Sequence, residues 1–261
     1  MLYAKSRQPL ASWSGFPYDG DQQDSGYKSH RKGVFRYMPR RKKSVDVKLR
    51  RTFQERLLSW YADNKRDLPW RKTSDPYNIL VSEIMLQQTQ VERVIPKYEE
   101  FLQKYPTLEA LANAPVEDVK QTWYPLGYNI RPVRLHSIAR EAVEKYGGKI
   151  PDNPEALQSL KGIGRYTVGA VLSFAFGREA PILDTNVRRV LHRVFVGQGD
   201  AKGYSVQREL WELSEALIPA GKAYEFNQAL MDFGATLCTA RKPLCLVCPL
   251  HDICKAFPCT P

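Results

Sequence analysis

The sequence has 261 residues, of which 43% are hydrophobic, and a formal net charge of +11 at pH 7. No apolar run approaches the roughly 18 residues needed to cross a bilayer, so a membrane-spanning protein is excluded. All five cysteines follow residue 237, and this clustering argues against a disulfide framework. The N-terminal segment has no apolar stretch that could direct export, so the two observations together indicate a cytoplasmic protein.

Positive charge is concentrated at the N-terminal end of the chain. Residues 1–52 hold 13 Lys or Arg against 4 Asp, and residues 39–51 are the densest part. Residues 1–46 lack helical periodicity and are rich in small, polar and charged residues, so we expect a disordered basic arm. Such an arm is typical of proteins that bind nucleic acid, although a solvated tail is the alternative.

The remainder is a succession of short amphipathic segments, most of them separated by Pro or Gly. No segment alternates with period two, so the sequence predicts an all-α protein of roughly ten helices. The predicted helical segments are residues 44–64, 78–105 (one or two helices), 108–114, 116–127, 131–147, 154–160, 164–177, 186–197, 205–219 and 225–238.

Residues 68–72, LPWRK, place Trp70 and Arg71 ahead of the helix or helices predicted over 78–105. An aromatic ring beside a cation could form a stacking surface for a nucleobase that has left its helix. The alternative is that Trp70 belongs to the core.

Glu83 lies among apolar residues at helical spacing, including Ile79, Leu80 and Leu86. A carboxyl on an apolar face is unusual, because burying its charge is costly. Burial would raise its pKa and make it a proton donor near neutral pH. Alternatively, the side chain reaches solvent at the edge of that face.

Residues 160–164, LKGIG, directly precede a predicted helix, an order that is typical of the helix-hairpin-helix motif. Gly162 and Gly164 permit a tight turn with little side-chain bulk, so that N–H groups of the next helix can contact a DNA phosphate. A plain loop with two glycines would look similar.

Asp184 follows an apolar run and precedes the helix predicted from residue 186. This position is typical of an N-cap. The same carboxylate could also present charge to a cleft, and the two roles are compatible.

The C-terminal segment contains a Cys-x6-Cys-x2-Cys-x5-Cys pattern. Four thiolates from one loop can hold Zn²⁺ or a [4Fe–4S] cluster, and the spacing leaves both open. Arg241 and Lys242 lie inside this loop and could meet phosphates, whereas Cys259 falls outside the pattern and is expected to take no part. The predicted ligands are Cys238, Cys245, Cys248 and Cys254.

Taken together, these motifs resemble the endonuclease III superfamily of helix-hairpin-helix DNA glycosylases, and within it the MutY adenine glycosylases. The similarity runs from about residue 52 to 254, and the resemblance implies [4Fe–4S] rather than zinc. The matching segments are residues 68–71, 81–91, 126–128, 160–170, 182–187, 226–235 and the four-cysteine loop.

We expect two helical lobes with a DNA cleft between them. Residues 73–180 form a six-helix lobe with the helix-hairpin-helix, and residues 47–72 join residues 181–261 in the lobe with the cluster. The sequence ends soon after the cysteine loop. We therefore expect a short form of the family without the domain that helps MutY enzymes recognise 8-oxoguanine.

The resemblance also assigns roles at the reacting centre. Glu83 matches the general acid that protonates the leaving purine, and Asp184 matches the carboxylate that stabilises the cationic sugar, with Asn186 as its hydrogen-bonding neighbour. We expect a buried acid and an exposed aspartate to divide this work, as two carboxylates do in glycosidases. Tyr166 matches a tyrosine that assists at the same centre. Lyase-type relatives carry a lysine there, so the resemblance implies a monofunctional glycosylase.

Further residues are assigned to DNA recognition. The predicted base pocket combines three residues matched by the resemblance with the aromatic residue noted above: Arg71, Leu86, Gln228 and Trp70. Gln88 and Tyr128 match the residues that wedge into the duplex beside the opposite base.

The sequence therefore predicts a monomeric, nucleoid-associated glycosylase that acts on double-stranded DNA with a mismatched or damaged base pair. We expect it to excise adenine opposite guanine or 8-oxoguanine. Residues 125–129 read PLGYN instead of the usual GLGYY, and the C-terminal segment is similar to short thymine-releasing glycosylases. The nearest competing hypothesis is therefore release of thymine or uracil opposite guanine. Two further hypotheses are a glycosylase with lyase activity and a non-catalytic DNA-binding protein.

Overall fold

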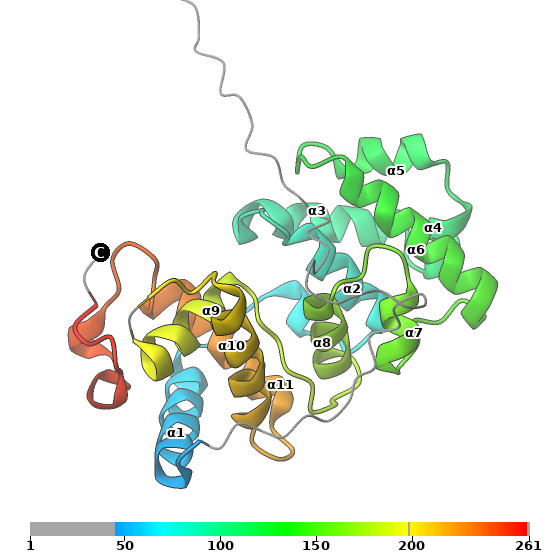
Figure 1. The fold of residues 1–261 in the computed structure, drawn as a ribbon. Coiled ribbons are helices and arrows are strands. Elements are labelled where there is room, and N and C mark those ends of the chain that lie inside the picture. The colour runs from blue at the N-terminus through cyan, green and yellow to red at the C-terminus, as the bar shows by residue number, and fades with distance from the viewer. Residues whose placement is uncertain (1–44, 198, 260–261) are drawn as a thin grey trace, which may run out of the picture. The chain divides into compact units, whose positions relative to one another are not determined.

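The computed structural model describes residues 45–197 and 199–259, which contain α- and shorter helices and no strand (Figure 1). The basic arm predicted over residues 1–46 lies outside these ranges except for its last two residues. The α-helices are α1 (Val47–Asn64), α2 (Pro76–Met85), α3 (Val91–Lys104), α4 (Leu108–Asn113), α5 (Val116–Trp123), α6 (Ile130–Tyr146), α7 (Pro154–Ser159), α8 (Arg165–Phe174), α9 (Thr185–Leu191), α10 (Tyr204–Ala216) and α11 (Ala223–Asp232).

The helices confirm the all-α prediction, and local chemistry explains many of their first residues. Proline at the first helical position lacks the N–H that would have no partner there, and polar side chains accept hydrogen bonds from the next free N–H groups. Proline begins α2 and α7. The side-chain caps are Asp46, Asp75, Thr107, Asn153 and Asp184.

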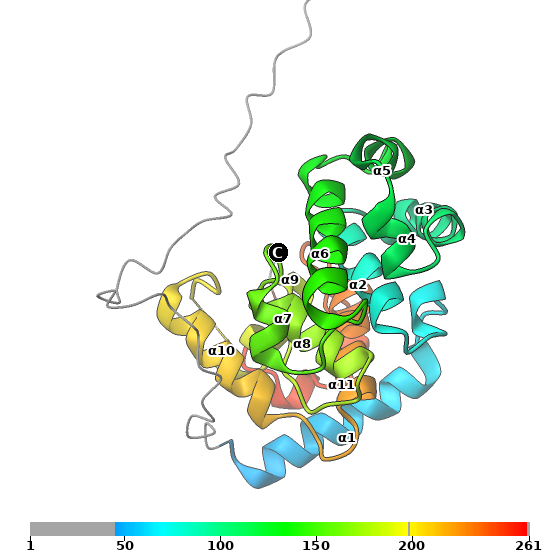
Figure 2. The same cartoon turned by 90° about the vertical axis from the view of Figure 1, so that its right-hand side faces the viewer.

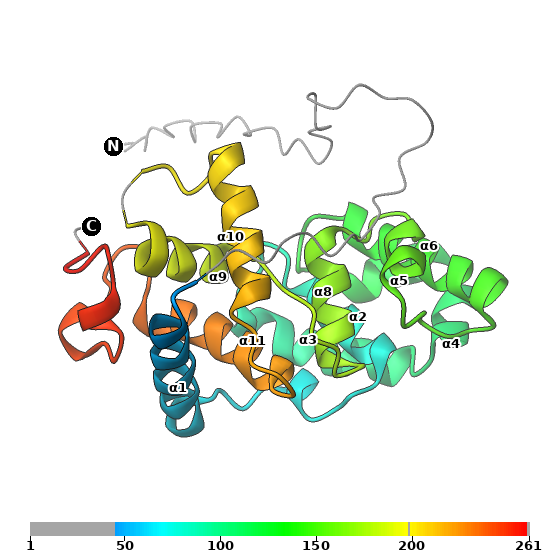
Figure 3. The same cartoon turned by 60° about the horizontal axis from the view of Figure 1, so that its bottom comes forward.

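The helices of the described segment pack in two groups that meet at α2 and α8. Helix α6 packs on α4, α5 and α2, and α3 joins them through α2 and α5, as Figure 2 shows. Helix α11 packs on α1, α9 and α8, while α8 also packs on α2. In Figures 1 and 3, α4–α6 lie at one end and the C-terminal loop at the other. The division into two lobes stays a prediction, because the described residues all fall within one compact unit. Residues 73–180 contain seven α-helices, α2 to α8, where six were predicted.

Helices α2 and α8 pass through the interior. Eight of the ten residues of α2 are buried, as are eight of the ten residues of α8. A Cβ atom at Gly169 would lie 2.1 Å from the Pro181 carbonyl oxygen, so this glycine lets the segment before α9 press against α8. That close approach brings the N-terminus of α9 towards the buried faces of α2 and α8.

In the described part of the chain, the helices are too short or too polar to cross a membrane.

Candidate active site and cysteine loop

Glu83 lies on α2 with 4% of its surface exposed, which confirms the predicted burial. Burial is the main cause that raises the pKa of Glu83 to about 7, and the negative charge of Asp184 acts in the same direction. The hydrogen bond from Tyr166 and the positive charge of Arg71 oppose the shift. A substantial fraction of Glu83 is therefore protonated at neutral pH, and the carboxyl can act as an acid.

Tyr166, in the first turn of α8, donates its hydroxyl hydrogen bond to Glu83. Burial raises the pKa of Tyr166 well above its ordinary value, and the charges of Glu83 and Asp184 add to the effect. The phenol stays protonated at neutral pH and serves as a neutral donor. The structure thus brings Glu83, Tyr166 and Asp184, which are far apart in sequence, within mutual electrostatic range.

Asp184 is the N-cap of α9, as predicted: its Oδ1 accepts a hydrogen bond from the Val187 N–H at 2.7 Å. Its Oδ2 accepts a hydrogen bond of 3.1 Å from the Asn186 side-chain amide. Burial raises the pKa of Asp184 while these donors oppose the shift. The residue is half-buried, which corrects the expectation of an exposed aspartate. The hydrogen bonds from Val187 and Asn186 hold the Asp184 carboxylate beside Glu83 and Tyr166 and favour its ionised form.

Arg189 links the N-terminus of α9 to the backbone around Gly234 and Cys238. Its Nη2 donates to the Asn186 side-chain oxygen at 2.8 Å and to the Gly234 carbonyl at 2.6 Å, and its Nε donates to the Cys238 carbonyl at 2.8 Å. A Cβ atom at Gly234 would lie 2.7 Å from the Asn186 Cβ, so only glycine allows this approach. The position of Asn186, and through it that of Asp184, is therefore tied to the backbone that leads into the cysteine loop.

Arg71 is held by Asp232 of α11 through two parallel hydrogen bonds of 2.7 and 2.8 Å. Arg66 donates to the same carboxylate from its backbone N–H and its Nε. Burial alone would raise the pKa of Asp232, but its pairing with Arg71 and Arg66 holds that pKa below its ordinary value. The Nε of Arg71 is buried and has no hydrogen-bond partner in the described residues.

The other predicted pocket residues occupy different environments. Gln228 is buried on α11, and Leu86 is half-buried at the C-cap of α2. Trp70 is buried with its ring 5.5 Å from that of Tyr98, edge to face. Trp70 is only 7% exposed and belongs to the hydrophobic core, so the structure favours a core role for it over the stacking surface.

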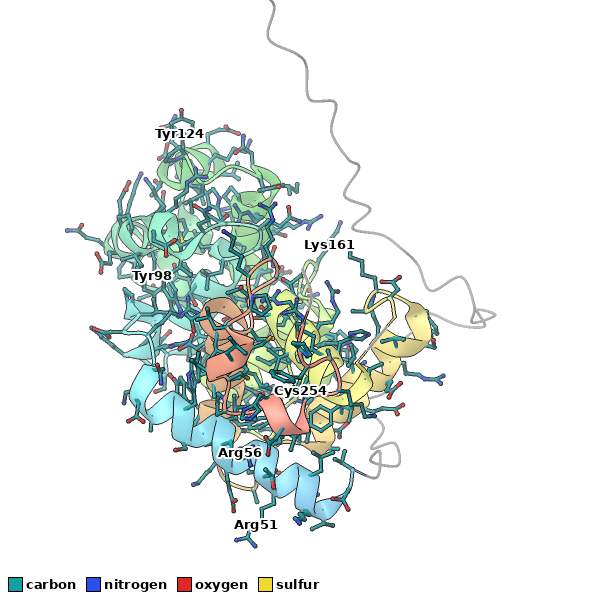
Figure 4. The ribbon with its side chains drawn as sticks, turned by 90° about the vertical axis from the view of Figure 1, so that its left-hand side faces the viewer. Arg51, Arg56, Tyr98, Tyr124, Lys161 and Cys254 are labelled. Carbon is teal, nitrogen blue, oxygen red and sulfur yellow. The ribbon has the colours of Figure 1, made fainter. Side chains whose placement is uncertain are left out.

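The loop before α8 requires glycine at one of its two positions. Gly162 has φ = +105°, whereas Gly164 has extended backbone that any residue adopts. This corrects the expectation that both glycines form the turn. A Cβ atom at Gly164 would meet nothing within 4 Å, so no neighbouring atom requires glycine there. Figure 4 shows Lys161 projecting from this loop.

Gln88 and Tyr128 are both exposed and lie in loops beside α2 and α6. Among the described non-glycine residues they alone have positive φ, at +53° and +49°. Arg241 and Lys242 are also exposed, on the loop between Cys238 and Cys245.

The four predicted ligands line one pocket, together with apolar side chains that include Leu237 and Leu250. Burial, and to a lesser extent the neighbouring thiols, raises the pKa of Cys248 to about 11. Thiolates crowded in this way need a cationic centre to neutralise them. No three Cys, His, Asp or Glu side chains of residues 45–197 and 199–259 converge on one ion position. A [4Fe–4S] cluster binds each thiolate through a different iron, so its ligands surround a larger object, and this donor set fits it.

Two arginines from outside the cysteine loop bind to it. Arg193, in the π-helical turn η2 (His192–Val196), donates from its Nη1 to the Cys238 Sγ at 3.4 Å and to the Thr239 carbonyl at 2.7 Å. Arg56 of α1 pairs with Asp252 and donates to the Pro249 carbonyl at 3.0 Å. Cys259, which the spacing left out, also lines the pocket and is hydrogen-bonded to Cys245.

Sequence reasoning missed three side chains that organise the site, the buried Asp232 and Arg131 and the half-buried Arg189. Asp232 lies on the apolar face of a predicted helix, so the argument that identified Glu83 would have found it. Two partners of Arg189 are backbone carbonyls 45 and 49 residues away, and Arg131, described below, also donates to distant backbone carbonyls. Nothing in the local sequence signals such contacts.

The arrangement can supply two complementary effects at one place. Glu83 offers a proton near neutral pH, and Asp184 offers negative charge beside it. A reaction in which a basic group leaves and a cationic centre develops is favoured by this pair.

Comparison with known families gives two matches. Residues 81–216 match the family described as HhH-GPD superfamily base excision DNA repair protein. Residues 238–254 match the iron-sulfur binding domain of endonuclease III, which confirms the predicted [4Fe–4S] cluster. The four cysteines would hold this cluster, and their common attachment to it would stabilise the loop that carries Arg241 and Lys242.

Individual relatives differ in how much of their length is matched. The chain is 46% identical over 213 residues to the adenine DNA glycosylase of Homo sapiens, covering 78% of this chain and 39% of that protein. It is 38% identical over 211 residues to the thymine/uracil-DNA glycosylase of Methanothermobacter thermautotrophicus, covering 80% and 95%. A solved structure of a thermostable thymine-DNA glycosylase aligns with a TM-score of 0.75 at 37% identity, covering 80% and 97%. The chain thus spans about two fifths of the three mammalian adenine glycosylases that it matches.

Proposed function

This chain belongs to the HhH-GPD superfamily of base excision DNA repair proteins, and we propose that it is a monofunctional DNA glycosylase that releases adenine from a mismatched duplex. The observation that carries the proposal is the buried carboxyl of Glu83, with a pKa raised to about 7, beside Tyr166 and Asp184. The identity to adenine glycosylases over 78% of the chain supports adenine as the base.

The proposed reaction divides the work between the two carboxyl groups. Glu83 gives its proton to N7 of the extruded adenine, and the electron pair of the C1′–N9 bond leaves with the base. Asp184 stabilises the positive charge that develops on the sugar. Water then adds at C1′ and loses a proton to solvent, which leaves an abasic site and free adenine. Glu83 regains its proton from solvent.

Tyr166 supports the monofunctional assignment. A lyase of this kind needs an amine to attack C1′ and form a Schiff base. The phenol of Tyr166 cannot form one, and its hydroxyl is engaged with Glu83. The proposed product is therefore an intact strand with an abasic site.

Three features support duplex DNA as the partner. The chain turns at Gly162 directly ahead of α8, and N–H groups at the start of a helix can hold a phosphate. Arg241 and Lys242 are exposed on the cysteine loop. The net charge of +11 favours a polyanion. These contacts would position the duplex without reading its sequence.

A second candidate is release of thymine or uracil opposite guanine. It is favoured by one observation: the chain is 38% identical over 211 residues to a thymine/uracil-DNA glycosylase and superposes on a solved thymine-DNA glycosylase with a TM-score of 0.75. The catalytic pair would be unchanged, and the pocket formed with Gln228 and Leu86 would accept a pyrimidine.

Four duplexes that differ in one pair, A·G, A·8-oxoG, T·G and U·G, separate the candidates. We expect adenine release from the first two at single-turnover rates at least about tenfold above the rates of pyrimidine release, because a pocket that hydrogen-bonds one base leaves polar groups unpaired with another. The measurement is strand cleavage at the abasic site after alkali.

Preferential cleavage of T·G or U·G would replace adenine by a pyrimidine as the substrate. Cleavage without alkali, with a borohydride-trapped adduct, would contradict the monofunctional assignment. If none of the four duplexes releases a base, the catalytic proposal as a whole is contradicted.

A further inference from the structure

Two loops hold exposed side chains on a strained backbone. Gln88 and Tyr128 have φ = +53° and +49°, a conformation that costs residues with a Cβ atom roughly 1–2 kcal/mol each. The Tyr128 side chain is 56% exposed, and Tyr124 in the same loop is 74% exposed; Figure 4 shows Tyr124 at the outer end of the molecule. Strain of this kind persists only where the surrounding structure enforces it.

One buried cation lies behind both loops. Arg131, in the first turn of α6, is 3% exposed. Its Nη1 donates to three backbone carbonyls at the end of α2, those of Ile84, Met85 and Gln87, at 3.1, 2.8 and 2.6 Å.

The other terminal nitrogen of Arg131 reaches the second loop. Its Nη2 donates to the carbonyls of Leu126 and Gly127 at 3.2 and 3.1 Å, and to the Thr89 hydroxyl at 3.0 Å. Its guanidinium also lies 5.3 Å from the ring centres of both Trp123 and Tyr128.

These acceptors explain how the strain is maintained. The carbonyls of Gln87 and Gly127 belong to the peptide groups that directly precede Gln88 and Tyr128. Fixing the direction of each carbonyl resists the peptide rotation that would relax the left-handed residue after it. A single guanidinium therefore holds both conformations and sets the separation between the two loops.

Arg131 is not explained as an ion-pair partner, because none of its six acceptors is a carboxylate. Burial lowers its pKa, and Tyr128 partly opposes the shift. The cost of burying the charge is offset by the hydrogen bonds and by the negative end of the α2 dipole. Only the planar fork of arginine can serve both segments; the single ammonium of lysine cannot.

We propose that Arg131 is a positioning residue that holds Gln88 and Tyr128 as one rigid pair for separating a target base from its stack. This inference rests on the proposed function, since it assumes a duplex whose base must be extruded. Arg131 does not touch the reacting atoms. It acts by fixing the two side chains that face the DNA.

The test compares Arg131→Lys with Arg140→Lys, a matched change at an exposed site on α6. Base extrusion is followed by the fluorescence of 2-aminopurine placed next to a target adenine, which carries a 2′-fluoro sugar to block its release. Single-turnover release is measured on the mismatched duplex and on a DNA whose target adenine lies in a single-stranded bubble.

Arg131→Lys is expected to lose most of the fluorescence rise and at least about tenfold in rate on the duplex, in line with the cost of misplacing positioning groups. On the bubble, where no stacked pair must be opened, its rate should approach that of the wild type. Arg140→Lys should match the wild type throughout. Equal losses on duplex and bubble, or an unchanged fluorescence rise, would overturn the proposal.

Thr89→Val provides a milder variant if Arg131→Lys does not fold. It removes one acceptor of Arg131 and keeps the cation, so we expect a smaller loss of release rate than in Arg131→Lys, confined to the duplex. Wild-type rates on both substrates would count against the proposal. The fluorescence does not depend on bond cleavage. A wild-type protein that extrudes the base without releasing it would refute the proposed function while still testing Arg131.

Discussion

Glu83→Gln is expected to reduce the single-turnover rate of adenine release by about 10²–10⁴-fold at pH 7, the usual contribution of general acid catalysis. Glutamine has nearly the same shape and can occupy the buried site on α2, but its amide cannot transfer a proton to the leaving base. The rate is measured with enzyme in excess over a mismatched duplex, and DNA affinity is measured by titration.

The matched control is Glu99→Gln, which makes the same change at an exposed position of α3. We expect wild-type release by this control and wild-type DNA affinity by both variants. Release by Glu83→Gln within about threefold of the wild type would remove Glu83 from the mechanism, because a general acid contributes far more.

Asp184→Asn is expected to cost about 10²–10³-fold in the same rate, comparable to the loss of a preorganised group that stabilises charge in a transition state. Asparagine is as good an N-cap as aspartate, so it can still accept from the Val187 N–H and keep α9 in place. What is lost is the negative charge beside the developing sugar cation.

The pH dependence of the release rate separates this electrostatic role from a structural one. The charge of Asp184 raises the pKa of Glu83, so its removal lowers that pKa. The loss of residual activity with rising pH should then begin at a lower pH than in the wild type. Asp46→Asn, which alters the cap of α1 in the same way, should change neither the rate nor the pH profile. A full rate with an unshifted profile in Asp184→Asn would contradict the assigned role.

The helices could be predicted from sequence because their signals are local. Pro76 and Pro154 begin helices, Asp46 and Asp184 cap them, and apolar periodicity fills the spans between. The boundaries differed at several helix ends: the helix predicted over residues 116–127 stops at Trp123, and the helix predicted over residues 186–197 is α9 followed by the π-helical turn η2. A π turn depends on tertiary packing around His192 and Arg193, which sequence periodicity does not encode.

The candidate site was predictable where a residue violated its local pattern. Glu83 stood out because a carboxyl lay on an apolar face, and the structure places it in the interior as expected. Arg131 and Arg189 could not be found in this way, since a long cation in an amphipathic helix looks like an ordinary surface residue. Trp70 shows the opposite error. Its place beside Arg71 in the sequence suggested a surface for stacking a base, but the fold buries its ring against Tyr98.

The pH dependence of single-turnover release tests the central claim most directly. Glu83 must be protonated to act, and burial raises its pKa to about 7, so the wild-type rate should fall as pH rises through that value. Because Asp184 must be ionised, activity should also fall at sufficiently acidic pH. The account predicts a descending limb near pH 7 in the wild type and its loss in Glu83→Gln. A wild-type rate that is constant through this range, or an identical limb in Glu83→Gln, would contradict it.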